Sequence, residues 1–189
     1  MPDIPLFVDD FESYNLTDLN GQGGWFGDSL IKVNNLIAYS GTKTVVMQSL
    51  ANLFMSRNIT SRTQGWWSAR IRRDFAKGAG PAFLTIFADD SAGKHITEIG
   101  FHSGAIKCVV NSVWTVLQSS YNLGQWYKVE LQWRSLPSLR ARYRIDDGLW
   151  TSWLALADAT ATGIAVTAEF QMNNSDATTI SYLDALGMS

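Results

Sequence analysis

Carboxylates lie among aromatic and aliphatic residues in strand-like runs near both ends of the chain. The first run contains Asp10 and Glu12, which project to the same side of an extended strand, and the last contains Asp184. An unpaired buried carboxylate is very costly, so each must face water or meet a cation. If the first and last strands are neighbours, Asp10, Glu12 and Asp184 are predicted to share one calcium ion, completed by carbonyls of the turn at 40–43. The alternative is that they are solvated edge carboxylates that discourage aggregation.

Eight tryptophans form the second group with possible chemistry. Trp66 and Trp67 are adjacent, so in a regular strand they point to opposite faces and one of them lies outside the core. A ring outside the core offers a flat apolar surface on which the C–H face of a sugar can stack. The candidate glycan-contacting tryptophans are Trp25, Trp66, Trp114 and Trp150. The alternative for each is that it fills a large core or a cluster beneath a loop.

Arginines alternate with apolar residues at Arg140, Arg142 and Arg144. The planar guanidinium suits bidentate recognition of carboxylate or sulfate groups, and Arg142 is the candidate contact to a glycan. The alternative is a solvated surface on which charges pair across strands.

Few residues favour catalysis. The chain has only four Glu, and no two of them are close in sequence. His95 and His102 flank Glu98, and Glu98 and His102 share a face, so an acid–base pair is conceivable; two ordinary histidines are the simpler interpretation. Cys108 has Lys107, Val109 and Val110 as neighbours, which is typical of a packing residue rather than a nucleophile. We therefore expect no catalytic residues.

The elements that must position these groups are strands. Apolar and polar residues alternate over Trp126–Arg134 and Leu139–Asp147, which indicates strands with one face in a core. No segment keeps a helical apolar pattern beyond about two turns, and Thr151–Ala161 is the nearest candidate. Frequent turn residues separate about a dozen short strands. Together these features predict an all-β, two-sheet antiparallel sandwich made of a single domain, residues 1–189.

Composition excludes several classes of function. Apolar residues make up 46% of the 189 residues, which rules out disorder. The net charge of −2 and the absence of a recognised motif predict no binding to nucleic acid. No transmembrane run is visible, so no membrane insertion is expected, and no signal peptide is visible either. The expected location is a virion or cell-surface assembly reached without a classical signal, or the cytoplasm.

Short motifs spread over nearly the whole chain resemble the concanavalin A-like (laminin-G-like) jelly roll. They are Asp-Asp-Phe-Glu-Ser-Tyr at 9–14, Gly24-Trp25, the run 39–43, Gly124–Leu131, the turn 144–148 and Tyr182-Leu183-Asp184. The resemblance implies two curved antiparallel sheets with the first and last strands paired, a structural calcium ion and carbohydrate binding. The family also contains glycoside hydrolases, polysaccharide lyases and structural proteins, so the fold leaves the function open.

Three functions therefore remain. The first is a non-catalytic, lectin-like module that binds a glycan or polysaccharide and is displayed on a larger assembly. The second is a virion structural, decoration or host-attachment protein that uses the fold for contacts with capsid, tail or other subunits. The third is a polysaccharide-degrading enzyme, either a glycoside hydrolase or a lyase. The absence of a catalytic motif favours recognition over cleavage.

Overall fold

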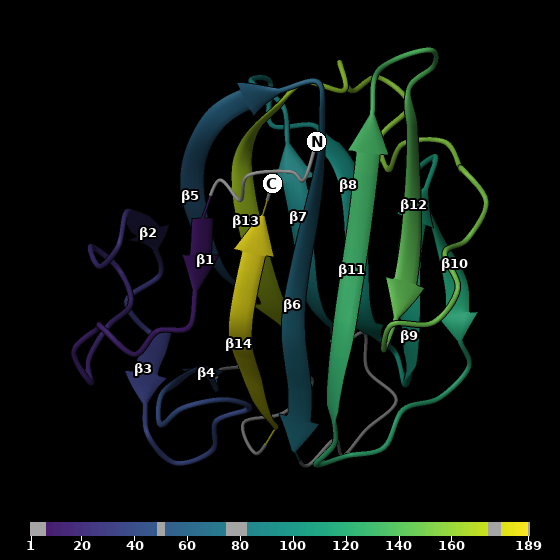
Figure 1. Cartoon of the computed structure of the whole chain (residues 1–189). Helices are drawn as coiled ribbons and strands as arrows, with labels where there is room; N and C mark the ends of the chain where they lie inside the picture. Colours follow the sequence, from purple (N-terminus) through teal and green to yellow (C-terminus); the bar gives the residue numbers. More distant parts are fainter. Residues whose placement is uncertain (1–6, 49–51, 75–82, 174–178, 189) are drawn as a thin grey trace.

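The computed structural model describes residues 7–48, 52–74, 83–173 and 179–188 as fourteen strands joined by turns and loops, with no helix among them. The strands form two seven-stranded sheets that face each other in a sandwich (Figure 1). None of the described segments is a helix that is long and apolar enough to cross a membrane.

Sheet A has the order β12-β11-β6-β14-β4-β3, and β1 also pairs with β14. Its strands are β1 (Phe7–Asp9), β3 (Lys32–Asn34), β4 (Thr44–Met47), β6 (Gln64–Asp74), β11 (Trp126–Arg134), β12 (Arg140–Ile145) and β14 (Ile180–Met188). Sheet B has the order β10-β9-β8-β7-β13-β5-β2. Its strands are β2 (Trp25–Gly27), β5 (Leu53–Arg62), β7 (Phe83–Asp89), β8 (His95–His102), β9 (Ala105–Val110), β10 (Val113–Gln118) and β13 (Ala165–Asn173). Every pairing is antiparallel.

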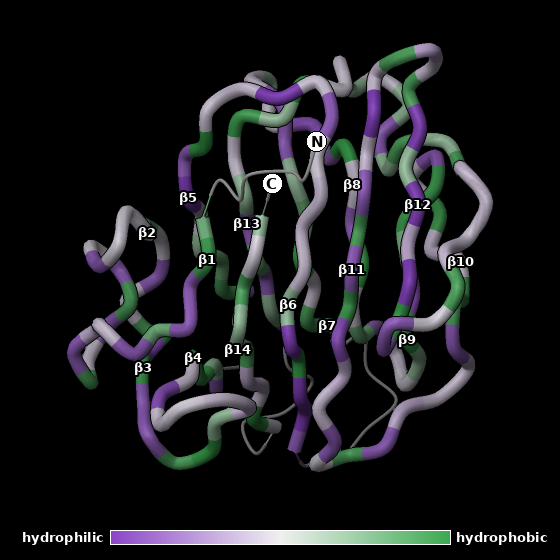
Figure 2. Tube along the Cα trace, viewed as in Figure 1, coloured by the Kyte–Doolittle hydropathy of each residue, from purple (hydrophilic) through white to green (hydrophobic). Residues whose placement is uncertain are grey.

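The core lies between the sheets and follows the alternation in the sequence. Hydrophobic and hydrophilic residues alternate along β11 and β12 (Figure 2), because successive side chains of a strand point to opposite faces. Val129, Leu131 and Trp133 of β11 are fully buried, and Tyr143 of β12 packs with them. The predicted strand Trp126–Arg134 and its inward set are therefore confirmed.

The first and last strands pair, as predicted. Phe7 lies opposite Met188, and Asp9 lies opposite Leu186. The first strand is shorter than the sequence suggested, because Phe11 has a φ of 60° and the chain turns there. Asp10 and Glu12 were expected to project to the same side of one extended strand. That expectation is wrong, because β1 ends at Asp9.

Two segments differ from the elements expected. Residues 25–27 form strand β2, although no alternating apolar pattern predicted a strand there. Thr151–Ala161, the nearest candidate for a helix, is extended at 154, where Leu154 bridges to Ala141 and both exchange backbone hydrogen bonds. Tertiary pairing with β12 thus decides the conformation of this segment.

Candidate ligand-binding site

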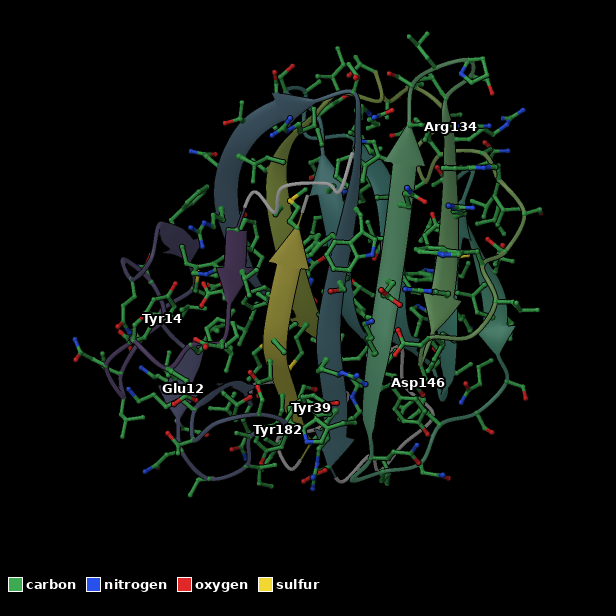
Figure 3. All side chains as sticks on the ribbon, viewed as in Figure 1. Glu12, Tyr14, Tyr39, Arg134, Asp146 and Tyr182 are labelled. Atoms are coloured by element: carbon green, nitrogen blue, oxygen red, sulfur yellow. The ribbon has the colours of Figure 1, made fainter. Side chains whose placement is uncertain are left out.

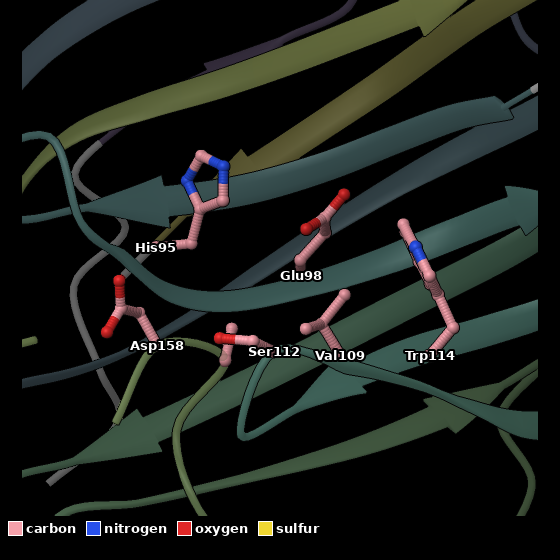
Figure 4. Close-up of a pocket in the computed structure, with 7 residues that line it drawn as sticks. His95, Glu98, Val109, Ser112, Trp114 and Asp158 are labelled. Atoms are coloured by element: carbon pink, nitrogen blue, oxygen red, sulfur yellow. The ribbon is translucent and has the colours of Figure 1, made fainter. Parts of the chain in front are cut away.

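A cleft of about 240 Å³ opens on the face of sheet B that points away from the core. His95 and Glu98 come from β8 and Trp114 from β10, and their side chains point to the same side (Figure 4). The rest of the lining is Val109 of β9 with Ser112, Ala157 and Asp158 from two loops. We call this site the β8–β10 cleft.

Tight turns and a docked loop position the rim of the β8–β10 cleft. β9 and β10 are joined by the two residues Asn111 and Ser112, both with positive φ (49° and 62°), as a hairpin turn of this length requires. The Ser112 N–H donates to the carbonyl of Ala157 at 2.6 Å. The Asp158 N–H donates to the carbonyl of His95 at 2.8 Å. The loop that carries Asp158 is therefore fixed to both the turn and the start of β8.

A histidine–aspartate pair lies at one end of the cleft. The distance from Nδ1 of His95 to Oδ1 of Asp89 is 2.6 Å, and Asp89 is 5% exposed. The hydrogen bond to Asp89 raises the pKa of His95 above its usual value of 6.5. The ring of His95 also packs on Phe87, with centroids 4.5 Å apart.

Two glutamates in the same row of sheet B have raised pKa values. Glu98 of β8 and Glu169 of β13 both lie opposite Phe87 of β7, one on each side. Burial is the main cause that raises both pKa values, and Glu98 is only 7% exposed. A raised pKa favours the protonated form of a carboxyl group, which is the form that can donate a proton to a bound molecule.

The other end of the cleft is aromatic. Trp114 stacks on His102 with ring centroids 4.2 Å apart, and His102 stacks in turn on Phe83 at 6.4 Å. Burial lowers the pKa of His102, and the positive charge of Lys107 lowers it further. The imidazole ring of His102 thus supports the Trp114 ring from one side.

The predicted glycan residues divide among three places. Trp114 lines the β8–β10 cleft. Trp66, Trp150 and Arg142 share the outer face of sheet A on the opposite side of the molecule, the face seen in Figure 3. Trp25 is 1% exposed, and its Nε1 donates to Asp9 at 2.8 Å, so Trp25 belongs to the core and is not available to a sugar.

Backbone N–H groups already occupy the carboxylates of Glu12 and Asp184, two of the three predicted calcium ligands. Glu12 Oε1 accepts the backbone N–H groups of Thr42 and Lys43, at 2.8 and 2.7 Å. Asp184 Oδ2 accepts the N–H groups of Tyr39 and Ser40, at 2.8 and 3.1 Å.

The turn therefore presents N–H donors to these carboxylates, whereas the predicted site needed its carbonyls. Asp10 Oδ1 accepts only the nearby N–H of Glu12. No group of three or more potential ligands gathers among the described residues. These contacts do not fit a shared ion, and calcium binding stays a prediction from the sequence.

Sequence reasoning missed two residues of the cleft and the partner of a third. Ser112 and Asp158 are far apart in the chain and meet only through loop docking. Asp89 lies in a turn-rich run of polar residues, and nothing local singles it out as the partner of His95. His95 and Glu98 were both noted in the sequence, but the acid–base pair considered there joined Glu98 to His102.

The two facing antiparallel sheets, with the first and last strands paired, form a jelly-roll sandwich, the fold of concanavalin A-like proteins. No protein-family model and no curated protein sequence matches it. Solved structures of similar fold include the following three. An endo-β-1,4-glucuronan lyase from the fungus Trichoderma reesei has a TM-score of 0.64 at 14% identity, with 98% of this chain and 95% of the lyase covered.

The lectin UEA-II, solved with galactose, has a TM-score of 0.60 at 11% identity, with 99% of this chain and 98% of the lectin covered. A sialidase has a TM-score of 0.64 at 10% identity over 88% of this chain. This chain spans only 17% of the length of that sialidase. Identities this low establish the fold alone.

Proposed function

We propose that this protein binds a neutral carbohydrate chain in the β8–β10 cleft. The observation that carries the proposal is that Trp114 and Glu98 border the same cleft. An aromatic ring offers a surface for the C–H face of a sugar, and the carboxyl, imidazole and hydroxyl groups around it can bond to sugar hydroxyls. The lectin and the glucuronan lyase of similar fold are named for carbohydrates, which supports this class of ligand.

The charges around the cleft favour a neutral ligand. Glu98 and Asp158 line it, and Glu169 lies in the same row as Glu98 on the far side of β7. Of the nearby cations, His95 pairs with Asp89, Lys94 pairs with Asp158 at 3.5 Å, and Lys107 lies at the aromatic end beside His102. Glu98 and Glu169 form no ion pair among the described residues, so an acidic sugar beside Glu98 would meet like charge whenever that carboxyl is ionised, and like charges disfavour binding.

Calorimetric titration with neutral oligosaccharides of glucose, xylose, mannose and galactose tests the proposal. Trp114→Ala is expected to weaken binding by about 5- to 150-fold, because one stacking contact contributes about 1–3 kcal/mol. Trp126→Ala is the matched control, because Trp126 of sheet A is half-buried and packs on Tyr39 of the loop before β4 and on Tyr182 of β14. Equal affinities of the two variants, or no binding by the native protein, would contradict the proposal.

Bond cleavage is the second candidate function. It is favoured by one observation: Glu98, with its raised pKa, lies in the cleft beside the His95–Asp89 pair. A protonated carboxyl and an imidazole can act as acid and base. Release of reducing ends or unsaturated products that disappears in Glu98→Gln would replace recognition by catalysis. Binding with no product from any polymer of the panel would support recognition alone.

Display on a larger assembly is part of the same proposal. One or two stacking contacts give weak affinity, so useful attachment needs many copies that act together. A virion or cell-surface assembly, with contacts to capsid, tail or other subunits, provides such copies. Electron microscopy of assemblies from the source of the protein tests this part, and a protein found only as free monomers would argue against it.

A further inference from the structure

Three cross-strand pairs lie on the outer face of β11 and β12. Along the strands, the positive charge is neutralised by a carboxylate in the first pair and has no carboxylate partner in the last. Register places Glu130 opposite Arg144, Gln132 opposite Arg142, and Arg134 opposite Arg140. The first pair is a buried ion pair, in which Arg144 donates to both oxygens of Glu130. The last pair sets two like charges directly opposite each other, which disfavours strand pairing. Arg134 lies at the end of β11, where it is labelled in Figure 3.

Trp150 and Trp153, from the segment after β12, pack against the guanidinium groups and hold them in place. The guanidinium carbon of Arg142 lies 4.8 Å from the ring centroid of Trp150 and 4.6 Å from that of Trp153. The guanidinium of Arg134 lies over Trp153 at 4.1 Å. The rings cover the flat faces of the guanidinium groups and leave their charge unneutralised. The N–H edges are the parts that remain for a ligand.

The positive charge of this cluster has no carboxylate partner in the part of the chain that the structure describes. No ion pair there involves Arg134, Arg140 or Arg142. The buried Nε of Arg134 has no hydrogen-bond partner among those residues. Burial lowers the pKa of Arg142, and the charges of Arg134 and Arg144 lower it further. A bound anion would relieve the repulsion among these like charges.

The neighbours of the cluster fit a sugar. Trp66 of β6 lies opposite Gln132, which in turn lies opposite Arg142. The Nε of Arg142 donates to Oε1 of Gln132 at 2.7 Å, which fixes the guanidinium in this row. An aromatic ring, an amide and an arginine thus follow each other across three strands, about 5 Å per strand. Asp146 and Asp147 at the other end of the face limit the positive region to one end.

We propose that Arg134, Arg140 and Arg142 form a binding site for the sulfate or carboxylate groups of an acidic polysaccharide. This site lies on the sheet opposite the β8–β10 cleft and is independent of it. The arginine edges hold the anionic group in charge-assisted hydrogen bonds. Trp66 and Gln132 contact the sugar that carries it.

Calorimetric titration of the native protein with dextran sulfate, polygalacturonate and plain dextran tests the site. Dextran sulfate or polygalacturonate is expected to bind, and plain dextran is not expected to bind here. Arg134→Gln and Arg142→Gln should each weaken that binding by about tenfold, the size of one charge-assisted hydrogen bond. Lys32→Gln is the matched control, because it removes one positive charge from an exposed side chain of β3, at the opposite edge of sheet A.

The control variant and control ligands distinguish a sugar-binding site from general attraction to positive charge. Equal losses in Lys32→Gln and Arg134→Gln would show that overall charge attracts the polymer, and would overturn the proposal. Free sulfate that binds as tightly as the polymer, or duplex DNA that binds with the same dependence on Arg134, would overturn its assignment to a sugar chain. Neutral oligosaccharide binding in the cleft should be unchanged in Arg134→Gln, so either site can fail without the other.

Discussion

Removal of the Asp9 carboxylate is expected to be among the most damaging single changes in this protein. Asp9 is 5% exposed and accepts hydrogen bonds from the Phe11 N–H at 3.1 Å, the Tyr14 hydroxyl at 2.5 Å and Trp25 Nε1 at 2.8 Å. It also meets the guanidinium of Arg57 at 3.3 Å. These contacts tie the first strand to the 11–14 turn, to β2 and to β5.

The size of the loss follows from what Asp9→Ala leaves behind. The indole N–H of Trp25 is buried and cannot reach water, and a buried donor without a partner costs about 1–3 kcal/mol. The N–H of Phe11, in a fully buried residue, adds a loss of the same kind. The side chain of Arg57 is 25% exposed and stays partly hydrated, so it adds only about 0–1 kcal/mol. Together these losses should lower the free energy of unfolding by about 2–7 kcal/mol.

Urea denaturation followed by tryptophan fluorescence measures this loss. Asp10→Ala is the matched control, because the neighbouring carboxylate is exposed and accepts one local N–H, and it should cost about 1 kcal/mol or less. Asp9→Asn separates charge from shape: its one amide oxygen can accept at only one of the two carboxylate positions, and its NH2 group cannot accept at the other, so it should lose part of the same stability. Equal losses in Asp9→Ala and Asp10→Ala would refute the reasoning.

Two further predictions concern pH and calcium. The pKa of His95 is raised above 6.5 in the folded protein, so its stabilising charge is complete below that value and is lost as the pH rises through the folded pKa. The Tm measured by scanning calorimetry should therefore fall from pH 6 to pH 8 more steeply in the native protein than in His95→Gln, and parallel profiles would argue against it. Because backbone N–H groups occupy Glu12 and Asp184, the Tm is expected to be the same in chelator and in millimolar calcium. A rise in Tm with calcium that is lost in Asp184→Ala would instead support the calcium ion predicted from the sequence.

Side-chain alternation made much of the fold predictable. The nine residues of β11 were predicted in full, with Leu131 and Trp133 in the core. The hairpin β8–β9 turns at Ser103-Gly104, a pair typical of turns in sequence, because both residues adopt positive φ and Gly does so without strain. The pairing of the first and last strands was also anticipated, from the carboxylates that both ends carry.

Local patterns failed where the backbone leaves a regular strand. The predicted faces of Asp10 and Glu12 assumed an extended chain, and the turn at Phe11 removed that assumption. Trp25 follows glycines and resembled a loop residue, yet β2 pairs with β5 and turns this ring into the core. Alternation in the sequence predicts which face of a sheet a side chain points to only where the residues do form a regular strand.

The sequence by itself determined the two-layer architecture, because a period of two in apolar residues has only one common solution: sheets that bury one face against each other. It also determined which residue types were available to meet a ligand. Only the tertiary structure decided which of them meet. Trp114 and Glu98 share a cleft because the register of β8, β9 and β10 aligns them, while Trp66 and Arg142 lie on the opposite sheet. Asp158 joins the cleft through a loop held by backbone hydrogen bonds to residues far away in the chain, and such contacts leave no local signal in a sequence.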